Sequence, residues 1–206
     1  MKKPHLNKIF TGFPSNGRII IFDLEFTSWK GSLQRNWSKI GEHREIVQIG
    51  AVLVDLDSNF KVIDQFNCLV KPNINKQLSD YFVELTGIDR SEVENFGNSF
   101  PKAYLKFLEF IGDSCVIYSN GNDGEVLLEN CKLNKINYKL EEDKVINFRI
   151  WLAEKVSEYL GKKYAVINSC DLMDVLTSKI SNKQKHNALD DAICLSEGIR
   201  ILLNLR

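Results

Sequence analysis

The sequence predicts an α/β fold built as one domain. Three apolar, β-rich segments with short connections occupy much of the first third of the chain and predict an antiparallel meander. Segments with apolar residues at helical spacing then alternate with a further short strand. No repeat or linker rich in proline or glycine divides the 206 residues. One domain is therefore expected over residues 17–206, after a polar tail at 1–16.

The strands are predicted from short apolar runs. Arg18–Phe22 holds three isoleucines and an aromatic residue, and the run is too short for a helix. Glu45–Asp55 is almost continuously apolar, while Phe60–Val70 alternates more loosely. The polar stretch at about 30–43 shows no periodicity and is expected to form a long loop. A fourth strand is predicted at Cys115–Ser119.

The helices are predicted from capping residues and apolar faces. Ser79 is a suitable N-cap, and Gly87 ends the apolar segment that follows it. A second helix is expected from about Ser99, because the aromatic and aliphatic residues after it share one face. Further helices are predicted at Asp123–Cys131, Ile150–Leu160, Leu172–Ile180 and Ala188–Leu203.

Composition limits the possible functions. The 27 basic residues balance 27 acidic ones, so a polynucleotide would have to be held by a local patch, metal ions and a pocket. The five cysteines are scattered and form no CxxC pair, which predicts reduced thiols and a cytoplasmic location. No segment is long and apolar enough to span a membrane, so no membrane partner is expected.

Two carboxylates, Asp23 and Glu25, follow the first apolar run. Being two residues apart on a strand, they point to the same side. Acid-x-acid pairs occur five times in the chain, but the other four lie next to turns or helix ends, where solvated acids are common. A central, buried strand makes charges unfavourable unless they are paired or bound to metal. A solvated acid at a strand end is the alternative for Asp23.

A histidine and two more acids complete the pattern. His186 precedes Asp191 by five residues at the start of the last helix, and Asp123 follows the fourth strand through the turn NGN. Taken alone, His186 is better explained as a polar residue in a loop before a helix. Because α/β folds place their sites at one edge of the sheet, the combination indicates a carboxylate cluster for divalent metal with a histidine base. Such a site hydrolyses phosphodiesters.

Five motifs together resemble one family. They are FDLEFTSW at 22–29, EIVQIGAVLVD at 45–55, LSDYFVELTGI at 78–88, SNGNDGEVLLENC at 119–131 and HNALDDA at 186–192. The chain resembles the DEDDh 3′→5′ exonucleases of the DnaQ-like, RNase H-fold superfamily, and within it the branch that trims histone mRNA and small RNAs together with the bacterial KapD-type proteins. This resemblance implies an RNase H-like fold: a five-stranded mixed sheet, its first three strands antiparallel, with helices on both faces.

The resemblance also implies the site residues. The carboxylates that would hold two divalent ions, Mg²⁺ or Mn²⁺, are Asp23, Glu25, Asp123 and Asp191, with His186 as the general base. The pocket for the 3′-terminal nucleotide would be lined by Phe26, Thr27, Trp29, Leu85, Thr86, Gly87 and Ile88. The chain departs from the family at Asn120, where tryptophan is frequent, in a short polar stretch at 178–185, and in segment 141–149, which has no assigned role.

The expected function is therefore a 3′→5′ exonuclease acting on single-stranded RNA or DNA ends and releasing nucleoside 5′-monophosphates. RNA is favoured only because the resembling branch acts on RNA. One alternative is a DNA-directed exonuclease of the same superfamily. A second alternative is an inactive nucleic-acid-binding module on the same fold, although all five catalytic residues are present. The sequence indicates no particular protein partner.

Overall fold

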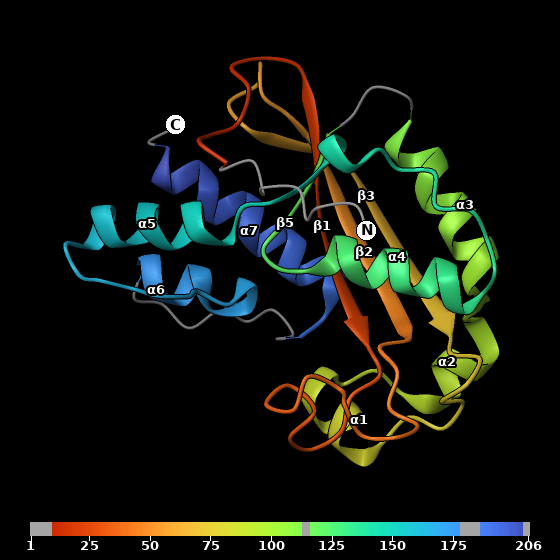
Figure 1. The fold of residues 1–206 in the computed structure, drawn as a ribbon. Coiled ribbons are helices and arrows are strands. Elements are labelled where there is room, and N and C mark those ends of the chain that lie inside the picture. The colour runs from red at the N-terminus through yellow and green to blue at the C-terminus, as the bar shows by residue number, and fades with distance from the viewer. Residues whose placement is uncertain (1–9, 113–115, 178–185, 204–206) are drawn as a thin grey trace, which may run out of the picture.

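The computed structural model describes residues 10–112, 116–177 and 186–203, which form a mixed sheet with helices on both faces (Figure 1). The strands are β1 Arg18–Phe26, β2 Ile46–Asp55, β3 Lys61–Lys71, β4 Asn98–Ser99, β5 Val116–Ser119 and β6 Val145–Asn147. The helices are α1 Asp80–Thr86, α2 Arg90–Phe96, α3 Phe100–Ile111, α4 Asp123–Leu133, α5 Arg149–Leu160, α6 Leu172–Thr177 and α7 Ala188–Leu202. Two 3₁₀ turns, η1 Glu142–Lys144 and η2 Ser169–Asp171, complete the order.

The strand order across the sheet is β4-β3-β2-β1-β5-β6. Strands β1, β2 and β3 pair antiparallel, which confirms the predicted meander, whereas β5 runs parallel to β1 and β6 parallel to β5. The expectation of five strands is wrong, because the described residues form six. Strands β4 and β6 have two and three residues, too few to show an alternating pattern in the sequence.

Strand β1 is central, and both of its faces are covered. Ile19 and Ile21 point into the core formed with α5, α6 and α7, while Ile20, Phe22 and Leu24 point into the core formed with α3 and α4. Because side chains alternate along a strand, Asp23 and Glu25 continue the row on the α7 face. The strand thus directs two charged residues toward a helix-covered side of the sheet.

The described helices follow the predicted order, with one short helix added. Ser79 caps α1 through a hydrogen bond from the Phe82 amide, and Gly87 ends that helix in the left-handed conformation, as predicted. Helix α2 was not predicted; it is a single short segment capped by Asp89. Helix α6 is described to Thr177, and the rest of the predicted Leu172–Ile180 helix lies outside the described residues. Segment 141–149, without an assigned role, contains η1, β6 and the start of α5.

Residues 10–16 precede β1 and contain no helix or strand, yet they contribute to the core. Phe10 and Phe13 pack edge-on against the Trp151 ring of α5, with ring centroids 5.4 and 5.2 Å away. The part of the expected tail that the structure describes is thus held by aromatic contacts. Across the described ranges, no helix combines the length and apolar character needed to cross a bilayer.

Candidate active site

Helix α7 approaches β2 so closely that no side chain fits between them. A Cβ atom on Gly50 would lie 2.1 Å from the backbone carbon of Ala188, so glycine is required there. Next to it, Gln48 accepts a hydrogen bond of 3.0 Å from the Ala188 amide and donates one of 2.9 Å to Asn67 on β3. The first turn of α7, which carries Asp191, is therefore fixed to the centre of the sheet.

The close packing of α7 against β2 brings together carboxylates that are far apart in the sequence. In the register of the sheet, Asp23 lies opposite Gly50 and Glu25 lies opposite Gln48. Carboxylate oxygens of Asp23, Glu25 and Asp191 all lie within 4.8 Å of one another. Glu25 and Asp191 are buried and Asp23 is half-buried. Oxygen ligands at this separation suit a hard divalent cation.

Asp123 approaches the same cluster from α4, which follows β5, the neighbour of β1 on the side opposite β2. It is the first residue of α4, and its side chain is 8% exposed. The parallel pairing of β1 with β5 ends at Ile21, and beyond that point the Leu24 amide donates to the Asp123 carboxylate. Burial raises the Asp123 pKa to about 6, although hydrogen bonds from Ser119 and the nearby Arg149 charge act in the opposite direction.

The pKa values of Asp23 and Glu25 are raised as well. Burial is the largest cause of a raised pKa at both Asp23 and Glu25, and the charges of Asp123 and Asp191 raise both further. Several carboxylates in one water-poor place repel one another, and a bound divalent cation would remove that repulsion. The donor set therefore fits a divalent metal ion, which Asp23, Glu25 and Asp191 could hold with Asp123 beside them.

His186 lies beside this cluster. A ring nitrogen of His186, an Asp191 oxygen and the Cys170 sulfur all lie within 4.8 Å of one another. The residue is half-buried and has a positive φ of 57°, a conformation uncommon outside glycine. Asn187 then caps α7 by accepting from the Asp190 amide. The five residues expected to be catalytic are thus gathered at one place.

The turn η2 contributes Ser169, which no sequence motif indicates. Ser169 donates a hydrogen bond to Asp23, which holds the Asp23 pKa lower than burial alone would set it. The Asn120 side-chain amide in turn donates to the Ser169 hydroxyl at 3.2 Å and to the Ile167 carbonyl at 2.8 Å. Asn120 therefore positions the serine that supports the central carboxylate. No sequence signal connects residues 120 and 169, because the contact is purely tertiary.

The residues expected to bind the terminal nucleotide do not all lie beside the carboxylates. Phe26 is half-buried on the α3–α4 face, with its ring 5.4 Å from that of Trp37, so it does not join the carboxylates. Thr27 is buried, and its hydroxyl donates to the His43 carbonyl at 2.5 Å, which holds the following loop. Trp29 is half-buried, and its amide donates to Ser32.

The LTGI motif at 85–88 forms the end of α1. The Thr86 hydroxyl donates to the Phe82 carbonyl, and Ile88 lies in a small core with Val47 and Val93. Leu85 is half-buried and Gly87 is exposed, so these two are available to a ligand. In the expected pocket wall, Thr86 and Ile88 therefore support the fold, while Leu85 and Gly87 are accessible.

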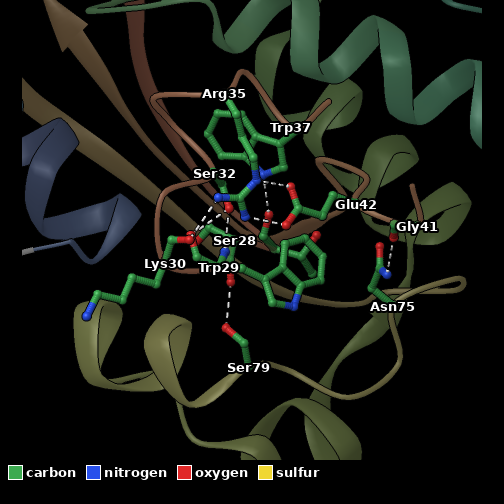
Figure 2. Close-up of polar contacts among 11 residues, drawn as sticks. Ser28, Trp29, Lys30, Ser32, Arg35, Trp37, Gly41, Glu42, Asn75 and Ser79 are labelled. Atoms are coloured by element: carbon green, nitrogen blue, oxygen red, sulfur yellow. Dashed lines mark hydrogen bonds and ion pairs between the residues drawn. The ribbon is translucent and has the colours of Figure 1, made fainter. Parts of the chain in front are cut away.

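Hydrogen bonds fix α1 to the segment that follows β1 (Figure 2). The Ser79 hydroxyl donates to the Ser28 carbonyl at 2.5 Å, and Arg35 pairs with Glu42 within the loop. The buried Glu45 carboxylate accepts from three successive backbone amides at 73–75. The loop after β1 and the connection leading to α1 are therefore held together before any ligand binds.

Comparisons with known proteins agree with this geometry. A family model described as Exonuclease (RNase_T) matches residues 20–197. The chain is 26% identical over 160 residues to 3′-5′ exoribonuclease 1 of Rattus norvegicus and 27% identical to that of Homo sapiens, in each case over 72% of this chain. It spans 44% and 43% of the length of these relatives.

Solved structures show the same fold. The nuclease domain of 3′hExo, a DEDDh family member bound to rAMP, matches with a TM-score of 0.71 and 22% identity, covering 93% of this chain and 96% of that one. Escherichia coli exonuclease I in complex with a dA16 oligonucleotide matches with a TM-score of 0.66 and 15% identity over 92% and 41%. The family match covers most of the chain, and the chain therefore belongs to the RNase_T exonucleases, with the DEDDh members among its structural neighbours.

Proposed function

We propose that this protein is a two-metal-ion 3′→5′ exonuclease that hydrolyses single-stranded nucleic acid from a free 3′-hydroxyl and releases nucleoside 5′-monophosphates. The observation that carries the proposal is the gathering of four carboxylates and His186 at the end of β1 in a chain of the exonuclease family. An inactive binding module would have no need to keep so many buried acids together, because each raises the free energy of the metal-free fold.

Mg²⁺ or Mn²⁺ is the proposed cofactor. All four proposed ligands are carboxylates, and hard cations prefer oxygen. When bound, the two ions would stabilise the charge that develops on the attacking and leaving oxygens of the phosphodiester. Asp23, Glu25, Asp123 and Asp191 would hold them, and the hydrogen bond from Ser169 favours the ionised form of Asp23 against the burial that raises its pKa.

His186 is proposed to accept the proton of the attacking water. Histidine is the side chain that changes its charge near physiological pH, so a neutral imidazole can accept a proton there. His186 lies just before α7, which carries Asp191, so the proposed base and one proposed metal ligand are held by neighbouring parts of the chain. Gly87 and Leu85 at the end of α1 are proposed to limit the site to a chain terminus, which makes the enzyme an exonuclease.

RNA is the proposed substrate, because the matched relatives are named exoribonucleases and the 3′hExo nuclease domain binds rAMP. The DNA-bound exonuclease I structures, also similar in fold, keep a DNA-directed enzyme as the second candidate. The cytosol is the proposed location, since the described cysteines Cys68, Cys131, Cys170 and Cys194 are not joined in disulfides.

One assay tests the activity and the substrate together. Single-stranded RNA and DNA oligomers with a 3′-hydroxyl are incubated with Mg²⁺, Mn²⁺ or chelator, and products are resolved to single nucleotides. We expect 5′-monophosphates from RNA with either metal, no release in chelator, and protection by a 3′-phosphate. Cuts within a circular single strand would contradict the exonuclease assignment, and faster release from DNA would favour the second candidate.

The role of His186 is tested by His186→Ala. Loss of one acid–base group should lower the rate by about two to four orders of magnitude, while the carboxylates still bind Mn²⁺ in calorimetry. The wild-type rate should rise with pH through the histidine titration and then level off. His5→Ala, in the tail, is the control. A mutant that cleaves nearly as fast as wild type across the pH profile would remove His186 from the mechanism.

A further inference from the structure

A second group of metal-binding side chains overlaps the candidate active site. Cys170 on η2, His186 before α7 and Asp191 within α7 offer a sulfur, a nitrogen and an oxygen atom that all lie within 4.8 Å of one another. Cys170 and Asp191 are buried, and His186 is half-buried. The proposed exonuclease reaction uses His186 and Asp191 but has no role for the thiol.

The three donors differ in kind from the carboxylate cluster. Thiolate and imidazole are ligands that select zinc, whereas Mg²⁺ and Mn²⁺ prefer oxygen. Three protein ligands with one open position for water are a common arrangement for zinc. The set Cys170, His186 and Asp191 therefore has the chemistry of a zinc site, placed next to a site with the chemistry of magnesium.

The spacing is compatible with one ion. Zinc lies about 2.3 Å from sulfur and about 2.0–2.2 Å from nitrogen or oxygen, so tetrahedral ligand atoms are roughly 3.3–3.7 Å apart. Because these atoms lie within 4.8 Å of one another, the widest pair would need to close by no more than about 1.5 Å. His186 is half-buried and lies just before α7, so its ring is the side chain with most room for that adjustment.

We propose that Cys170, His186 and Asp191 bind one Zn²⁺ ion and that this ion inhibits the exonuclease. Zinc on the imidazole nitrogen occupies the lone pair that would accept the proton of water, and zinc on Asp191 withdraws one ligand from the catalytic ions. The inhibitory part rests on the proposed function, whereas the binding site itself does not. The enzyme would then be active in magnesium and silenced by a small excess of zinc.

Turn η2 carries two adjacent residues with separate tasks. Ser169 supports Asp23, while Cys170 faces His186 and Asp191. Because only Cys170 is specific to the zinc site, Cys170→Ser removes the thiolate and leaves the catalytic residues unchanged. Cys68→Ser is the matched control, since Cys68 is equally buried but lies in the core on the α3–α4 face.

The binding test uses Co²⁺ as a coloured substitute for zinc. Thiolate-bound Co²⁺ absorbs in the near ultraviolet through charge transfer from sulfur, and carboxylate-bound Co²⁺ does not. We expect this band to saturate with one equivalent of Co²⁺ in wild type and Cys68→Ser, to disappear on adding Zn²⁺, and to be missing in Cys170→Ser and Cys170→Ala. A wild type without the band, or variants at Cys170 that keep it, would overturn the site.

The inhibition test measures nucleotide release in excess Mg²⁺ as Zn²⁺ is raised. Cys170→Ser should keep the wild-type rate without zinc and need at least about tenfold more zinc for half inhibition, the usual minimum effect of disturbing a metal's ligand sphere. Equal zinc sensitivity in both proteins would overturn the inhibitory role. If wild type releases no nucleotides in Mg²⁺ but shows the cobalt band, the proposed function fails and the zinc site stands.

Discussion

The raised pKa of Asp123 makes the metal-free protein sensitive to pH. In the folded protein the pKa is about 6, against 3.8 for an ordinary aspartate, so between these values the folded chain holds a proton that the unfolded chain has released. Folding stability therefore falls as pH rises through this window. Asp123 is 8% exposed, so solvent screens this effect little. The penalty for the ionised carboxylate is about 3 kcal/mol once pH exceeds about 6.

Asp123→Asn removes that penalty while keeping an oxygen that accepts from the Leu24 amide and Ser119. In chelator, the mutant should match wild type near pH 4 and be up to about 3 kcal/mol more stable near pH 8. Urea unfolding at several pH values measures the difference. Adding Mg²⁺ at the higher pH should stabilise wild type and help the mutant less, because the mutant lacks one metal ligand.

Glu125→Gln is the control, since Glu125 is an exposed acid in the same first turn of α4. It should change stability by no more than about 0.5 kcal/mol at any pH. A stability difference between Asp123→Asn and wild type that stays constant from about pH 4 to about pH 8 would refute the electrostatic account of the cluster.

Two further predictions concern residues that support the site. Ser169→Ala should weaken Mn²⁺ binding by about 10- to 100-fold in calorimetry, because Asp23 loses its hydrogen-bond donor. Ser58→Ala, which removes an exposed serine–aspartate bond at the surface, should leave Mn²⁺ affinity unchanged. Gln48→Leu should lower stability by about 1–3 kcal/mol in urea unfolding, because the buried Ala188 amide loses its acceptor. The exposed Gln65→Leu is its control, and equal losses in both would contradict the role of Gln48.

The sequence predicted the helices and strands that have a clear apolar pattern or strong capping residues. Strand β1 and its Asp23–Glu25 pair were recognisable because a continuous apolar run changes to alternating acids at the strand end. The capping residues of α1 were likewise visible, since Ser79 and Gly87 have strong positional preferences. Strands β4 and β6 were missed because pairing with neighbours, and not their own pattern, makes such short segments strands.

The parts of the site that escaped prediction depend on contacts between distant segments. Nothing in the local sequence of Gln48 indicates that it accepts from an amide 140 residues away. Phe26 lies on the opposite face of β1 from Glu25, and its contact with the terminal nucleotide stays a prediction. Glu45 gave no signal, because its partners at 73–75 are backbone amides, which any sequence can supply.

The close packing of α7 against Gly50 has a consequence while the chain is being synthesised. The strands that carry Asp23 and Glu25 leave the ribosome long before the helix that carries Asp191. Until that helix docks, the growing chain holds an incomplete set of metal ligands and lacks the histidine. The carboxylate cluster of the proposed site is therefore complete only after α7 has docked against β2.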